Sequence, residues 1–170
     1  MYDVVLLIEQ GLSELDARQV ASLHDGLDDP VAYHVLLPVD DASSHVHAAL
    51  GSIAGYEMIL PTHALSDEAL ARLDAELVEE AKAGLARSLT LLRATGRRAT
   101  GELTHGNPVR GLVRAAADRD AREAIVLTGP HAIRDFLHVD WTSKARRSLG
   151  IPCLHLIEHE TFEQQAGGNA

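Results

Sequence analysis

The hydrophobic positions of this chain gather into short, nearly continuous runs, a pattern that is typical of strands buried on both faces of a parallel sheet. Four such runs are expected to form strands, at Val4–Ile8, Val31–Val39, Ala124–Thr128 and Ile151–Ile157. A fifth stretch, Arg98–Thr104, is more polar and contains a glycine, which suits a strand at the edge of the sheet. The pattern therefore predicts five strands.

Between these strands, apolar residues recur at helical spacing, and residues suited to helix ends bound each stretch. Helices are predicted from Ser13 to about His24 and from Ser66 to Gly96, each opening on a serine that can cap the first turn. A third helix begins at Asn107-Pro108, because proline loses no hydrogen bond at the first helical position. A fourth begins near Asp140 or Thr142 and ends at Gly150.

Alternation of strands and helices with short joints predicts an α/β fold. We expect a single-domain, open, parallel five-stranded sheet of order 3-2-1-4-5 with helices on both faces, a Rossmann-like arrangement. The domain is expected to span residues 1–159 and to contain a variable loop at about 40–64. Residues 160–170 show no periodic pattern and are expected to form a disordered tail.

Charge and composition narrow the functional classes. Acidic residues outnumber basic ones by 25 to 15, and the net charge of −10 argues against nucleic acid and anionic membranes as partners. No apolar run approaches the roughly 20 residues that span a bilayer, and the first residues do not resemble a signal peptide. Cys153 is the only cysteine, so the chain has no internal disulfide. We therefore expect a cytoplasmic protein.

Three local motifs are informative because of their order and spacing along the chain. They are the helix start Gly106-Asn107-Pro108, the AIVLTG run of residues 124–129, and the spacing of Pro152, Leu154 and Leu156 in the last strand. In this order the chain resembles the universal stress protein family over residues 1–158. The resemblance implies the sheet order given above and pairing of two copies through the last strand, whose apolar edge is itself a template for pairing.

Ligands of such sheets lie at the carboxyl ends of the strands where the strand order reverses, here the first and fourth strands. In the family, an acidic residue after the first strand contacts a nucleoside, and Glu9 is its counterpart here. The candidate binding residues are the following: Glu9, Val39, Thr128, Gly129, Asp140 and Thr142.

The phosphate-binding motif of the family is altered in this chain. Nucleotide-binding members carry Gly-x-x-Gly, nine residues, and then Gly-Ser or Gly-Thr after the fourth strand. Gly129 can supply the first glycine, but Ala132 stands at the second, and Val139-Asp140 stands where the final pair belongs. A β-carbon obstructs the approach of backbone N–H groups to phosphate, and an aspartate repels it. The sequence thus predicts no cofactor, and ATP is the alternative.

Metal chemistry and catalysis find little support in the sequence. Among the ten histidines, His45, His47 and His63 are the best candidate metal ligands, but histidines in loops are mostly solvated, so no metal site is predicted. The phosphate loops of the enzymes that activate substrates with ATP on related folds, His-x-Gly-His and Ser-Gly-Gly-x-Asp-Ser, do not occur.

Three functional classes remain: a non-enzymatic binding protein, a nucleotide-binding module and an enzyme. The missing phosphate loops favour the first, a non-enzymatic stress-response or regulatory protein that acts by dimerisation or by binding an unknown protein partner. The alternative is an ATP- or AMP-binding protein with an altered phosphate loop.

Overall fold

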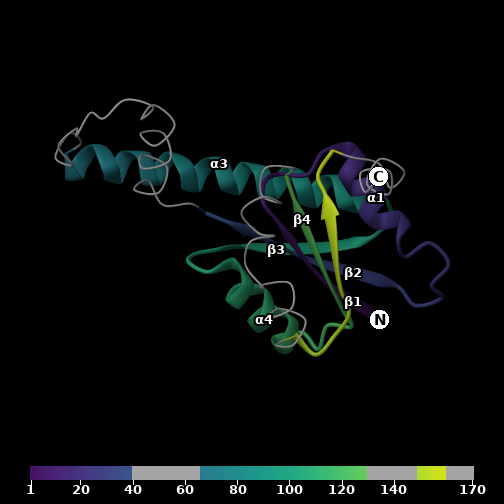
Figure 1. The fold of residues 1–170 in the computed structure, drawn as a ribbon. Coiled ribbons are helices and arrows are strands. Elements are labelled where there is room, and N and C mark those ends of the chain that lie inside the picture. Colours follow the sequence, from purple (N-terminus) through teal and green to yellow (C-terminus); the bar gives the residue numbers. More distant parts are fainter. Residues whose placement is uncertain (40–65, 130–148, 160–170) are drawn as a thin grey trace, which may run out of the picture.

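The computed structural model describes residues 1–39, 66–129 and 149–159, and five parallel strands form its single sheet (Figure 1). The strand order is β3-β2-β1-β4-β5, which confirms the predicted fold class and order. The strands are β1 (Tyr2–Ile8), β2 (Val31–Pro38), β3 (Arg98–Thr104), β4 (Glu123–Thr128) and β5 (Cys153–Ile157).

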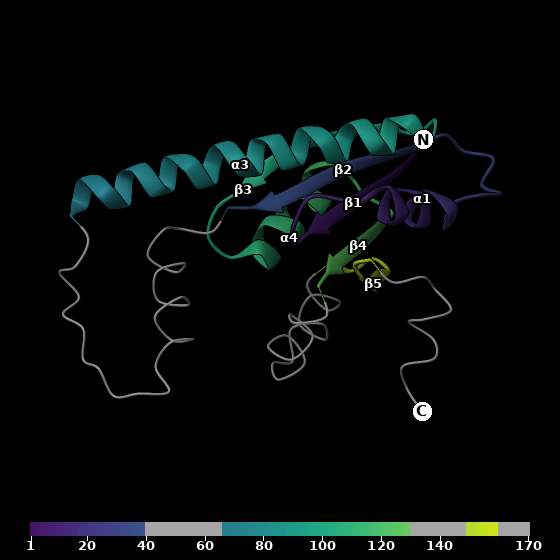
Figure 2. The ribbon, with the colours of Figure 1, turned by 90° about the horizontal axis from the view of Figure 1, so that it is seen from above.

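Helices cover both faces of the sheet, as predicted (Figure 2). Helices α1 (Glu14–Ser22) and α3 (Asp67–Ala94) pack on one face, and α4 (Pro108–Asp118) packs on the other. Each face has its own apolar core, with Leu6 on the side of α1 and α3 and Leu7 on the side of α4. None of the described helices is long and apolar enough to cross a membrane.

Three of the predicted helix starts are confirmed by their capping contacts. The Ser13 hydroxyl accepts a hydrogen bond from the Asp16 backbone N–H at 3.2 Å, and the Asp16 carboxylate accepts one from the Ser13 N–H at 2.9 Å. Ser66 and Asn107 cap α3 and α4 in the same way, through the backbone N–H groups three residues further on. These caps satisfy backbone donors that have no partner within the helix.

Two predicted boundaries are wrong for identifiable reasons. Strand β5 begins at Cys153 rather than Ile151, because Pro152 has no N–H and contributes only its carbonyl oxygen, which accepts from Ala124 at 2.9 Å. Strand β1 begins earlier than predicted, because the Tyr2 N–H already bonds to the Pro30 carbonyl at 2.9 Å. The loop at about 40–64, most of the predicted fourth helix and the tail 160–170 lie outside the described residues.

Helix α3 carries its buried positions only in its C-terminal half. Gly84, Leu85, Ser88 and Leu92 are buried there, while no residue of its first half is. Figure 2 shows this first half extending past the ends of the strands. The helix predicted from Ser66 to Gly96 therefore packs on the sheet over only part of its length.

Gly101 and Gly84 offer a matched test of this packing. A β-carbon at Gly101 would lie 2.7 Å from the Val35 carbonyl oxygen, so Gly101→Ala is expected to destabilise the fold by about 1–3 kcal/mol. At Gly84 the nearest atom would be 3.7 Å away, and Gly84→Ala in mid-helix is expected to stabilise by about 0.5–1 kcal/mol. Urea unfolding followed by circular dichroism measures both; equal stability of Gly101→Ala and the native chain would contradict the packing.

Candidate functional site

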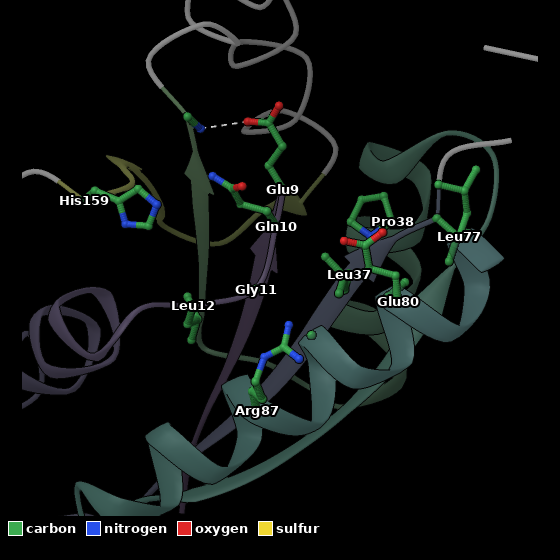
Figure 3. Close-up of a pocket in the computed structure, with 14 residues that line it drawn as sticks. Glu9, Gln10, Gly11, Leu12, Leu37, Pro38, Leu77, Glu80, Arg87 and His159 are labelled. Carbon is green, nitrogen blue, oxygen red and sulfur yellow. Dashed lines mark hydrogen bonds between the residues drawn. The ribbon is translucent and has the colours of Figure 1, made fainter. Parts of the chain in front are cut away.

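A cavity of about 780 Å³ opens where β1 and β2 end and α3 passes over them (Figure 3). Five segments form its walls: the end of β1, the end of β2, one side of α3, the residue that follows β4, and the segment that follows β5. The lining residues are Glu9, Gln10, Gly11, Leu12, Leu37, Pro38, Val39, Leu77, Glu80, Ala81, Gly84, Arg87, Gly129 and His159.

Small residues let the loop after β1 lie against α3 and form one wall of the cavity. A β-carbon on Gly11 would lie 3.3 Å from the Gly84 Cα, which is a tight contact, whereas one on Gly84 would lie 3.9 Å from the Gly11 Cα. The buried Ser88 hydroxyl accepts a hydrogen bond from the Leu12 N–H at 2.9 Å and donates to the Gly84 carbonyl at 2.8 Å. The loop is therefore held to the helix by a hydrogen bond as well as by contact.

Two carboxyl groups flank the start of the loop that follows β4. The Gly129 N–H donates to Glu9 Oε2 at 2.7 Å, as the dashed line in Figure 3 shows. Gln10 donates to Glu158 twice, from its backbone N–H at 3.3 Å and from its side-chain amide at 2.5 Å. A β-carbon on Gly129 would lie 3.5 Å from Glu9 Oε2 and 3.7 Å from Glu158 Oε2.

Burial raises the pKa of Glu158, which is only 2% exposed, above the ordinary value of a glutamate. The hydrogen bonds from Gln10 oppose this shift, and the negative charges of Glu9 and Asp16 add to it. Glu158 is thus a carboxyl group held at the cavity edge in surroundings that favour its protonated form.

His159, the residue after Glu158, connects the end of β5 to the start of α1 through contacts with Asp16. The His159 N–H donates to Asp16 Oδ1 at 2.7 Å, and its Nδ1 lies 3.2 Å from Asp16 Oδ2. Asp16 is 1% exposed and also belongs to the cap of α1. One buried carboxylate therefore fixes both the start of the helix and the segment that leaves β5.

The structure brings three of the six sequence-predicted site residues to the cavity, namely Glu9, Val39 and Gly129. Thr128 is buried, and its hydroxyl lies 2.8 Å from His155 Nε2; it is not part of the lining. Asp140 and Thr142 lie outside the described residues, as do Ala132, Val139 and the histidines at 45, 47 and 63. The binding role of all six stays a prediction.

The sequence interpretation missed the contribution of α3 and of the segment after β5. Glu80 and Arg87 of α3 were not among the predicted site residues; both are exposed, and both line the cavity. Glu158 directly follows the last strand, so extending the strand-end rule to β5 would have found it. Among the described residues, no group of three or more histidine, cysteine, aspartate or glutamate side chains could hold a metal ion.

The charge at the cavity is predominantly negative. Among the described lining residues, Glu9 and Glu80 carry negative charge, and Arg87 is the only arginine or lysine. Carboxylates accept hydrogen bonds from the N–H and O–H groups of a ligand and repel anions. The described part of the site is thus suited to neutral or cationic groups.

Comparison with solved structures shows the fold of the chain. It is similar to the hypothetical protein MJ0577, with a TM-score of 0.58 and 16% identity over 95% of this chain and 99% of that one. It is also similar to the universal stress protein from Archaeoglobus fulgidus, with a TM-score of 0.51 and 14% identity over 91% of this chain and 93% of that one.

A protein of the universal stress protein family from Burkholderia pseudomallei gives a TM-score of 0.50 and 14% identity, over 91% of this chain and 96% of that one. No family model and no curated protein matches the sequence. The chain therefore has the universal stress protein fold, which confirms the fold implied by its sequence motifs.

The raised pKa of Glu158 makes stability depend on pH in a defined direction. A carboxyl whose pKa is higher in the folded than in the unfolded chain favours folding when protonated, and this contribution is lost as pH rises through the folded value. The unfolding free energy of the native chain is therefore expected to rise relative to that of Glu158→Gln as pH falls from about 7 toward about 5.

Urea unfolding at both pH values measures this difference. Glu14→Gln is the matched control, because the Glu14 side chain is 76% exposed. Its difference from the native chain is expected to stay constant with pH. A native chain that gains no stability over Glu158→Gln on acidification would show that folding does not raise the pKa of this carboxyl.

Proposed function

We propose that this chain is a non-enzymatic stress-response or regulatory protein that does not hold ATP in its crevice and acts through dimerisation or binding of another protein. The observation that carries the proposal is the hydrogen bond from the Gly129 N–H to the Glu9 carboxylate at 2.7 Å. Gly129 stands at the position where the phosphate motif of nucleotide-binding universal stress proteins begins.

This hydrogen bond opposes phosphate binding in two ways. A short bond from an N–H to a carboxylate is charge-assisted and among the stronger hydrogen bonds, so it occupies a donor that a phosphate would need. It also fixes a negative charge at the start of the loop. Like charges about 4 Å apart repel by about 4 kcal/mol at an effective dielectric constant of about 20, before screening by salt.

The sequence supplies independent support for the same conclusion. Ala132 and Val139 replace glycines of the motif, and Asp140 adds a further negative charge to a chain whose net charge is −10. The absence of the His-x-Gly-His and Ser-Gly-Gly-x-Asp-Ser loops from the sequence supports a role that is not enzymatic.

A second candidate function is nucleotide binding through an altered phosphate loop. The cavity favours it, because about 780 Å³ lies within the range of small-molecule sites, and Glu9 and Val39 line it as the family resemblance implies. This alternative requires the loop after Gly129 to hold the phosphates despite the nearby carboxylates.

Titration calorimetry with Mg-ATP decides between the two functions. The native chain is expected to bind Mg-ATP with a dissociation constant of about 1 mM or higher. Charge repulsion and the occupied Gly129 N–H each cost up to a few kcal/mol, and each 1.4 kcal/mol lowers the affinity about tenfold. Glu9→Gln, which keeps the size and removes the charge, is expected to bind ATP more tightly than the native chain. A dissociation constant below about 10 μM for the native chain would establish the nucleotide-binding function instead.

Dimerisation through β5 is the second testable part of the proposal. Strand β5 stands at the end of the sheet order, and its Leu154 and Ile157 are half-exposed. An apolar strand at a sheet edge is a template for pairing that folded proteins usually cover. Two copies paired along β5 would form one continuous sheet.

Light scattering at micromolar concentration is expected to give twice the mass of one chain. Ile157→Lys places a charge on β5 and is expected to lower the mass toward that of a single chain. Thr100→Lys is the control, since it places the same charge at an exposed position of β3, the opposite edge. A native chain with the mass of one copy, or equal dissociation by both variants, would refute pairing through β5.

A further inference from the structure

A second cavity, of about 430 Å³, lies where β3 ends and α4 begins. Its described lining comes from one stretch, residues 104–114, and shares no residue with the described lining of the crevice at the ends of β1 and β2. The charge of this second cavity is opposite in sign to that of the crevice, because the charged groups of its described lining are cationic.

Two arginines supply this charge. Arg110 and Arg114 are four residues apart on α4 and therefore lie on the same side of the helix, and both line the cavity. Side chains on a helix lean toward its N-terminus. The long Arg114 side chain therefore extends its guanidinium toward the first turn of α4. Within the described part of the chain, neither guanidinium forms an ion pair.

The hydroxyl of Thr104, a buried residue that lines the cavity, is the second independent feature of the cavity. Thr104 is 6% exposed, and its hydroxyl has no hydrogen-bond partner among the described residues. A β-carbon on Gly111 would lie 2.7 Å from Thr104 Oγ1, so only the missing side chain of Gly111 leaves the hydroxyl open to the cavity. The hydroxyl is therefore accessible from the cavity, where it can form a hydrogen bond with a ligand oxygen.

The start of α4 adds to the positive potential. The helix begins at the cavity with Asn107 and Pro108, and its first turn contains no acidic residue but does contain Arg110. The N-terminal end of a helix carries a partial positive charge that favours anions and disfavours cations. The arginine is therefore placed where it is electrostatically unfavourable unless an anion lies beside it.

From these features we propose that the cavity between β3 and α4 binds a tetrahedral oxyanion, either inorganic phosphate or the phosphoryl group of a small phosphoester. Guanidinium groups bind phosphate through two parallel hydrogen bonds, and two of them line this cavity. The Thr104 hydroxyl supplies a further donor, and the helix N-terminus supplies the favourable field. The cavity is larger than one phosphate ion, which leaves room for a small organic group.

The test is a titration of the ¹⁵N-labelled full chain at constant ionic strength, followed by amide chemical shifts. One arm uses sodium phosphate and the other uses glycerol 3-phosphate. Saturable shifts are expected at the amides of residues 106–114, at concentrations of about 1–10 mM, which is typical of weak anion sites. Tighter binding of glycerol 3-phosphate assigns the site to a phosphoester, and tighter binding of phosphate assigns it to the free ion.

A matched pair of variants separates a site from a general effect of charge. Arg114→Gln is expected to weaken binding about tenfold, the cost of losing one hydrogen bond between charged groups. Arg119→Gln removes the same charge from the end of α4 outside the cavity lining, and is expected to leave the affinity unchanged within about twofold. Both arginines are exposed, so the variants are expected to fold.

Absence of saturable shifts up to about 50 mM of either anion would overturn the proposal, since binding that weak has no selectivity for the site. Equal loss of affinity in the two variants would overturn it as well, because that result indicates long-range attraction rather than a cavity. Neither result bears on the crevice, whose described lining shares no residue with this one.

Discussion

The burial of strand β1 is the constraint on which the rest of this structure depends. Every side chain from Val4 to Ile8 is buried, and β1 pairs in parallel with β2 on one side and β4 on the other. The chain leaves β1 first toward β2 and β3 and later returns to form β4 and β5. The connections therefore diverge at the carboxyl end of β1, and the crevice opens at this reversal of the strand order.

Much of this fold is predictable from the sequence because its signals are local. An apolar run marks a strand on its own, and Ser13 or Asn107 marks a helix start through contacts within three residues. The errors arose where a boundary depends on a neighbouring strand, as at Pro152. The same holds for the site. Glu9 and Gly129 directly follow strands, so the sequence locates them. Arg87 lines the cavity only because α3 crosses the sheet at that residue, which no local signal indicates.

The two cavities differ in how far the protein satisfies its own charges. In the crevice, Glu9 accepts from the Gly129 N–H and Glu158 accepts from Gln10, so the carboxylates already have donors within the chain. At the start of α4, the described residues provide no carboxylate for Arg110 or Arg114. Because Arg110 and Arg114 are exposed and have no carboxylate partner among the described residues, the second cavity offers an anionic ligand more free donors than the first.

The end of β5 connects the crevice to the edge of the sheet. Glu158 and His159 follow directly after this strand; Glu158 holds Gln10, and His159 holds Asp16 at the start of α1. A partner that adds a strand to β5 would act on the same segment that positions the carboxyl groups beside Gly129. A ligand in the crevice that displaced Gln10 from Glu158 would in turn release one restraint on the end of β5. Glu158 and His159 thus tie the end of the edge strand to the loop after β1 and to the start of α1.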